Sequence, residues 1–191
     1  MSFIYRHDDG ELIKMKHMTI NGIGGKVHYW ISRPNNNFKG ALVFTHGLTA
    51  NHTMYERQVE YFKDDYVVIT WDVPLHGLSI PYKEFSYEIA ARDLNSILLQ
   101  ESIGKVCLIG MSMGGYPSQM FAYLYPEKVQ CFVGIDTTPF RTEYYSRSDL
   151  WWLSKVKTMA KWFTDKTLRK SMAKSVAVTD YSYNKMIEML K

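Results

Sequence analysis

Cysteine is scarce in this sequence, and its scarcity excludes a fold stapled by disulfides. The chain has two cysteines in 191 residues, Cys107 and Cys131. Both lie in apolar runs, VCLI and VQCFVGI, so we interpret them as buried thiols, not as a disulfide framework or a metal site. Unpaired thiols of this kind are typical of a reducing compartment.

Long hydrophobic runs are also absent. No apolar run approaches the roughly 18 residues that a membrane-spanning helix needs. The N-terminal segment MSFIYRHDDGELIK carries charges where a secretory signal needs an apolar stretch. Apolar residues make up 46% of the chain and charged residues 22%, which excludes a disordered or fibrous protein. We therefore expect a cytoplasmic protein without a membrane span.

Several functional signatures are missing as well. The sequence has no internal repeat, no metal-ligand spacing, no phosphate-binding glycine loop and no pattern of interleaved basic and aromatic residues. We therefore expect no metal, no cofactor and no nucleic-acid partner. Charge is unevenly placed, because residues 141–191 hold 11 lysines and arginines against 5 acidic residues. This asymmetry indicates a domain boundary near residue 140.

Short apolar runs alternate with helical patterns over the first 140 residues. The predicted strands are residues 41–45, 66–71, 106–109 and 129–135, and the predicted helices are residues 54–62, 87–102 and 113–124. This alternation indicates an α/β fold with a mostly parallel sheet, and continuous apolar runs are typical of strands buried on both faces. Residues 14–20 and 26–32 alternate about an NGIGG turn, which predicts an antiparallel hairpin at the N-terminal edge.

Beyond residue 140 the sequence shows only helical patterns. Trp152, Val156, Met159 and Phe163 would share one face of a helix. Such a helix either packs on the core or forms a lid over a hydrophobic pocket, and the sequence does not separate the two. We predict a core of residues 1–140 and a truncated helical cap segment of residues 141–191.

The strongest chemical signal is the pentapeptide Gly110-Met111-Ser112-Met113-Gly114, placed between a predicted strand and a predicted helix. Strand, motif and helix in this order are typical of a nucleophile elbow, the sharp turn that presents a reactive serine. The flanking glycines are needed because a Cβ would collide with the neighbouring strand and helix. The turn would expose Ser112 Oγ and place the Met113 amide where it can donate to an oxyanion.

Two further motifs follow predicted strands. His46-Gly47-Leu48 comes after residues 41–45, and the octapeptide DVPLHGLS, residues 72–79, comes after residues 66–71. Their loops should emerge at the carboxyl edge of the sheet, where ligands bind in open α/β folds.

With these motifs in this order, residues 14–140 resemble the α/β-hydrolase superfamily. The resemblance implies that Ser112 is the nucleophile and that the backbone amides of Leu48 and Met113 form the oxyanion hole. Serine at this position implies acyl transfer on esters, thioesters or amides, or related carbon–carbon bond hydrolysis, although peroxidase-like relatives keep it too. One departure is Leu75, which stands where the family usually has glycine and puts the tightness of that turn in doubt.

No histidine follows His76, although the family order places an acid and then a histidine after the serine. A serine hydroxyl needs a base within hydrogen-bond reach. We therefore expect an N-terminal fragment of a longer hydrolase, without the last strands. Asp136 is a candidate acid, although Asp-Thr-Thr-Pro is also an ordinary turn sequence. His46 and His76 lie at the correct edge and are expected to shape loops.

The leading hypothesis is a serine hydrolase that acts on a small-molecule, hydrophobic acyl substrate through an acyl-enzyme. The alternative is a catalytically incomplete hydrolase-like protein that serves as a binding or self-associating module. Its contact surface would be the sheet edge that the missing strands would have occupied.

Overall fold

The computed structural model describes residues 2–6, 12–35, 37–140, 142–148, 150–151, 154–155, 171, 174 and 177–189. The chain divides into two units, Met1–Thr138 and Pro139–Lys191. None of the helices in the described part of the chain combines the length and the apolar content that crossing a bilayer requires.

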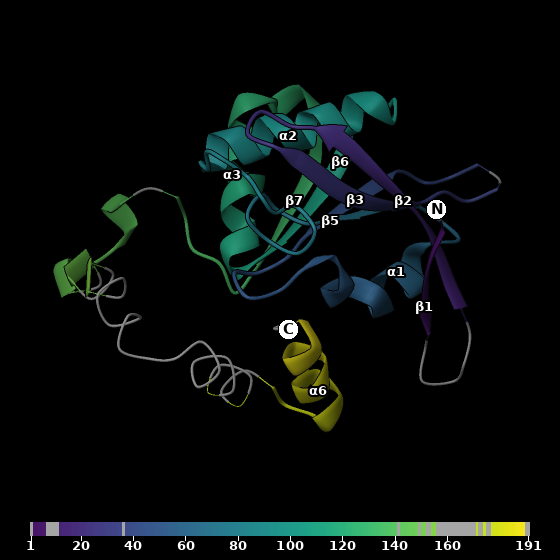
Figure 1. Ribbon diagram of the computed structural model, residues 1–191. Helices are drawn as coiled ribbons and strands as arrows, with labels where there is room; N and C mark the ends of the chain where they lie inside the picture. Colours follow the sequence, from purple (N-terminus) through teal and green to yellow (C-terminus); the bar gives the residue numbers. More distant parts are fainter. Residues whose placement is uncertain are drawn as a thin grey trace. The chain divides into compact units, whose positions relative to one another are not determined.

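The first unit is organised around a sheet of seven strands in the order β1-β2-β3-β5-β4-β6-β7 (Figure 1). The strands are β1 (Ser2–Arg6), β2 (Leu12–Asn21), β3 (Lys26–Ser32), β4 (Ala41–Thr45), β5 (Val67–Trp71), β6 (Val106–Met111) and β7 (Val129–Ile135). The pairs among β1, β2, β3 and β5 are antiparallel, and the pairs among β5, β4, β6 and β7 are parallel. The predicted fold class is confirmed: a mostly parallel sheet with an antiparallel N-terminal edge.

Helices lie on both faces of the sheet (Figure 1). The α-helices are α1 (Glu56–Phe62), α2 (Tyr87–Gln100), α3 (Gly115–Leu124) and, in the second unit, α6 (Asp180–Met189). Leu94 of α2 and Phe121 of α3 share a buried cluster with Val43, whereas Val59 of α1 shares the other with Phe44. Neighbouring residues of β4 therefore point into different clusters, as the alternation of side chains along a strand requires.

Two α-helices begin later than predicted, because a short 3-10 turn precedes each of them. Residues His52–Tyr55 precede α1, and Ser112–Gly114 precede α3, so each α-helix begins two residues later than predicted. Strand β1 was not predicted, because its short and partly charged sequence carries no clear alternation. The residues predicted to line the face of a lid helix, Trp152, Val156, Met159 and Phe163, lie outside the described residues.

One burial prediction is wrong. Strands β4 and β5 are buried along their whole length, but β7 is exposed from its second residue to its last. The cause is its place at the end of the sheet order, where it has one strand neighbour, β6, among the described residues. For the same reason Cys131 is exposed and Cys107 only partly buried; both are free, and the prediction of two buried thiols does not hold.

Candidate active site

The structure places Ser112 on a strained turn at the carboxyl end of β6. Its φ is 50°, a left-handed value that residues with a Cβ rarely adopt, and its side chain is exposed. A Cβ on Gly110 would stand 2.5 Å from the carbonyl oxygen of Gly114. A Cβ on Gly114 would collide with the carbonyl oxygens of Thr45 and His46. The close approach of α3 to β4 and β6 therefore requires both glycines.

The loop after β4 lies against this turn. A Cβ on Gly47 would stand 3.7 Å from the Cβ of Ser112, an ordinary van der Waals separation. The next residue, Leu48, has an exposed side chain, and its carbonyl oxygen accepts a hydrogen bond from His76 Nε2 at 2.7 Å. His76 therefore connects the loop after β5 to the backbone of Leu48.

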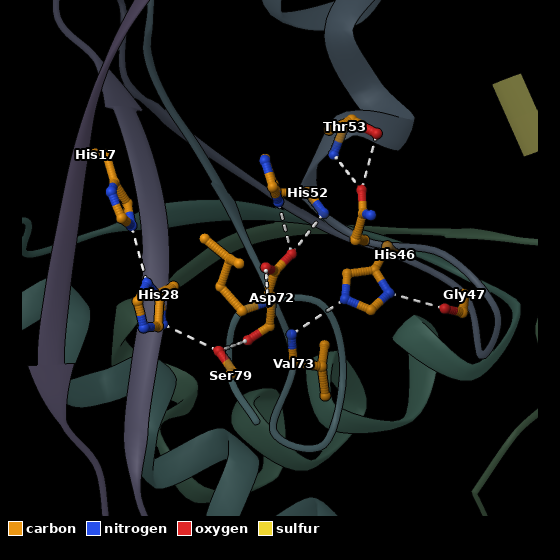
Figure 2. Close-up of polar contacts among 11 residues, drawn as sticks. His17, His28, His46, Gly47, His52, Thr53, Asp72, Val73 and Ser79 are labelled. Atoms are coloured by element: carbon orange, nitrogen blue, oxygen red, sulfur yellow. Dashed lines mark hydrogen bonds and ion pairs between the residues drawn. The ribbon is translucent and has the colours of Figure 1, made fainter. Parts of the chain in front are cut away.

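His46 is completely buried, and both of its ring nitrogens are bonded to backbone (Figure 2). Nδ1 donates to the carbonyl oxygen of Gly47 at 2.8 Å, and the Val73 amide donates to Nε2 at 3.1 Å. Burial lowers the pKa of His46 to about 4. The imidazole is thus neutral and holds two loops in place, and it has no nitrogen available to take a proton from Ser112.

His46 should make the stability of the protein depend on pH. Its pKa is about 4 in the folded chain and about 6.5 in the unfolded chain, so the unfolded state alone gains a proton between these values. The contribution of His46 to the free energy of unfolding is complete above pH 6.5 and decreases as the pH falls. At pH 5 it is smaller by about 2 kcal/mol. Urea unfolding of wild type and His46→Gln at pH 8 and pH 5 should show a smaller pH effect in the variant. Equal pH effects in both proteins would contradict this assignment.

Asp72 joins the loop after β4 to the loop after β5 from inside the core. Its Oδ1 accepts hydrogen bonds from the backbone amide and from Nδ1 of His52, both at 2.8 Å, and its Oδ2 accepts one from the Leu78 amide at 2.7 Å (Figure 2). Burial alone would raise the pKa of Asp72, but the hydrogen bonds and charge of His52 and the Leu78 amide hold it below its ordinary value. Asp72 is therefore an ionised carboxylate enclosed by donors.

His52 was not singled out from the sequence. Its ring stacks on Trp30 with centroids 3.3 Å apart, and the ring of His17 also stacks on this indole, with centroids 4.7 Å apart. No local pattern marks this arrangement, because His52 and Trp30 come from separate elements. In the sequence, the only indication of this arrangement was Asp72, the aspartate that directly follows the buried strand β5.

Leu75 adopts the conformation that glycine would accept without cost. Its φ is 69°, and its amide donates to the carbonyl oxygen of Ser79 at 3.2 Å. A left-handed conformation costs a residue with a Cβ roughly 1–2 kcal/mol. The turn therefore keeps its form despite the leucine, which answers the doubt raised by this departure from the family pattern.

Asp136 lies at the same edge of the sheet as Ser112. Met111 and Ile135 are register partners on β6 and β7, so Ser112 and Asp136 are the next residues on two neighbouring parallel strands. Asp136 is exposed and also has a positive φ, 47°. The structure thus brings the two residues to one edge, each directly after the end of one of two neighbouring parallel strands.

Within the described residues, no group of three or more histidine, cysteine, aspartate or glutamate side chains is arranged to hold a metal ion. The groups described at this edge include the exposed Ser112, the carboxylate of Asp136 and backbone amides.

Comparison with known proteins identifies the family. The family model described as the alpha/beta hydrolase fold matches residues 40–185. The chain belongs to the α/β-hydrolase fold family. The resemblance found in the sequence is thereby confirmed.

The curated proteins similar to this chain include an enol-lactonase and a diacylglycerol lipase. The chain is 34% identical over 89 residues to 3-oxoadipate enol-lactonase 2 of Acinetobacter baylyi, covering 46% of this chain and 33% of that protein. It is 32% identical over 104 residues to the sn-1-specific diacylglycerol lipase ABHD11 of Mus musculus, covering 53% and 34%. The chain thus spans about one third of the length of these relatives.

A solved α/β-hydrolase structure shows the same fold. The N-acyl homoserine lactonase AidH, in a mutant complexed with N-hexanoyl homoserine, matches with a TM-score of 0.69 and 18% sequence identity. The match covers 92% of this chain and 65% of that one.

Proposed function

We propose that this chain carries the nucleophile and the oxyanion-binding loops of a serine hydrolase. The observation that carries the proposal is the conformation of Ser112: an exposed hydroxyl, a left-handed φ, and two glycines whose replacement would produce a collision. Strain of this kind persists where the surrounding structure enforces it, and it is concentrated at active sites.

In the proposed reaction, Ser112 Oγ attacks the carbonyl carbon of an acyl substrate. The developing oxyanion accepts hydrogen bonds from the amides of Leu48 and Met113, the second of which lies in the first turn of a helix. The His46 and His76 contacts would keep the first amide in position. Collapse of the tetrahedral intermediate gives an acyl-enzyme, which water then hydrolyses.

The base that activates Ser112 is not assigned among the described residues. His46 and His76 both direct their ring nitrogens to backbone groups. Asp136 would serve as the acid of the triad and orient a histidine from its position beside Ser112. For Asp136 to have this role, the histidine that it orients must lie close to the ends of β6 and β7.

The proposed substrate class is a small ester, or a related thioester or amide. Support comes from the two curated relatives, which are named for a lactone and a diacylglycerol, both of which contain ester bonds. We propose that residues 141–191 belong to a cap over a hydrophobic acyl group.

Ser112→Ala should abolish reaction with a fluorophosphonate and lower ester hydrolysis by at least about 10³-fold, since a triad acts as a unit. The measurement is labelling of the full-length protein together with turnover of a p-nitrophenyl ester. Ser96→Ala is the matched control, because Ser96 is exposed on α2 and bonds the Arg92 carbonyl. Ser96→Ala should label like wild type. Labelling that survives in Ser112→Ala would overturn the assignment.

A second function is favoured by the exposed apolar edge strand. Phe132, Val133 and Ile135 of β7 are 38%, 47% and 41% exposed, and such strands are templates for pairing with another chain. Under this alternative the protein is a self-associating module without hydrolytic activity. Gel filtration would then show a dimer that Val133→Lys converts to a monomer, and Ser112→Ala would have no effect.

A further inference from the structure

Two thiols lie side by side in the sheet. Cys107 of β6 and Cys131 of β7 are register partners in a parallel pair. Register partners on parallel strands project from the same face and lie about 4.8 Å apart, within the roughly 4.4–6.8 Å range of Cα separations in disulfides. A hydrogen bond also links the Cys107 thiol to Cys131. The spacing expected for this register pair therefore falls within the range of Cα separations that disulfides span.

The two thiols differ in accessibility. Cys131 is exposed, whereas Cys107 is partly buried and packs against the cluster that contains Phe44. Burial, together with the hydrogen bond from Cys131, raises the pKa of Cys107 to about 11. A soluble oxidant therefore reaches Cys131 first, and Cys107 stays protonated beside it until a reactive sulfur forms there.

We propose that Cys107 and Cys131 form a redox-modification site, at which a peroxide oxidises Cys131 and Cys107 then closes an intramolecular disulfide. In the first step the Cys131 thiolate attacks one oxygen of the peroxide. The O–O bond breaks, the departing oxygen takes a proton, and a sulfenic acid remains, so sulfur is oxidised by two electrons and the peroxide is reduced.

In the second step Cys107 gives up its proton, and its sulfur attacks the sulfur of Cys131. The S–O bond breaks, hydroxide takes up the released proton and leaves as water, and the S–S bond forms. The product joins the strand that ends at Ser112 to the strand that ends at Asp136. The site requires no hydrolytic role for either residue, so it stands independently of the proposed function.

The full-length reduced protein, treated with a few equivalents of hydrogen peroxide, tests the proposal. Remaining thiols are then blocked with N-ethylmaleimide, and the protein and its peptides are weighed by mass spectrometry. We expect loss of two hydrogen atoms, simultaneous protection of both cysteines, a linked peptide pair, and full recovery with dithiothreitol. A disulfide between two chains through Cys131, or sulfinic acid at Cys131 with Cys107 still alkylated, would overturn the proposal.

Single variants separate the two roles. In Cys107→Ser, Cys131 should accumulate as a sulfenic acid that dimedone traps, because its resolving partner is gone. In Cys131→Ser, oxidation of Cys107 should slow at least tenfold. Oxidation of Cys107 at the wild-type rate in Cys131→Ser would contradict the order of events, and circular dichroism of each variant checks that it is folded.

Discussion

Asp72→Ala is expected to lower the free energy of unfolding by about 3–5 kcal/mol. The carboxylate is completely buried and accepts three hydrogen bonds, two from His52 and one from the Leu78 amide. Alanine leaves these donors buried without their acceptor, and each unsatisfied donor costs roughly 1–3 kcal/mol. The loops after β4 and β5 would also lose the group that joins them. Urea denaturation at neutral pH measures the loss.

Asp65→Ala is the matched control for this prediction. Asp65 pairs with Lys39 at 2.9 Å, but both side chains are more than half exposed. Solvent screening makes such pairs weak, so Asp65→Ala should unfold close to wild type. Asp72→Asn, which keeps one acceptor oxygen, should lie between the two. Equal stabilities for Asp72→Ala and Asp65→Ala would show that the buried network does not stabilise the fold.

The pH dependence of the same contribution has a definite sign. Because the folded-state pKa of Asp72 is lowered, its stabilisation is complete above the ordinary aspartate range and is lost as the pH falls through the lowered folded value. The window lies below that of His46, whose contribution declines between about 6.5 and about 4. As the pH is lowered, wild type should therefore lose the stabilising contribution of His46 first and that of Asp72 last.

Gly114→Ala is expected to destabilise the protein by at least the upper end of the roughly 1–3 kcal/mol typical of overpacking. The added Cβ would collide with the carbonyl oxygens of Thr45 and His46, which belong to backbone and cannot rotate away. Relief requires separation of α3 from β4, which would displace Ser112 from the loop at Gly47. We expect fluorophosphonate labelling to fall together with the urea midpoint.

Two other glycines provide controls for that substitution. A Cβ on Gly47 would be in ordinary contact with Ser112 and Met111, and one on Gly104 would have nothing within 4 Å. Gly47→Ala tests crowding beside the site, and Gly104→Ala tests the change of residue type alone. Both should be far less destabilised than Gly114→Ala. If all three lose the same stability, the close approach of helix and strand is not the cause.

The strand, turn and helix around Ser112 could be predicted because each depends on neighbouring residues. Apolar runs, glycine spacing and helical periodicity are local properties, and together they located the motif between β6 and α3. The antiparallel hairpin could also be predicted, since its turn and its two strands are adjacent in the sequence. The left-handed φ of Leu75 could not be predicted, because leucine does not favour this conformation and only the surrounding turn enforces it.

The contacts among the loops could not be predicted, because they join residues far apart in the chain. Nothing near His46 indicates that the Val73 amide occupies its second nitrogen, and nothing near Asp72 indicates that it binds His52. Each partner is brought in by the crossover connections of a parallel sheet. The tertiary structure also decides protonation: burial leaves His46 neutral, and the donors around Asp72 leave it ionised.

The sequence by itself therefore determined the fold class, the order of the motifs and the serine on which the chemistry is proposed to act. Tertiary structure alone decided the burial of β7, since an apolar strand is covered only where neighbours exist on its free edge and faces. It also decided which histidines are engaged and that Cys107 lies beside Cys131. The physical reason is the same in each case: secondary structure follows from local periodicity, whereas burial and pairing depend on strand order and register.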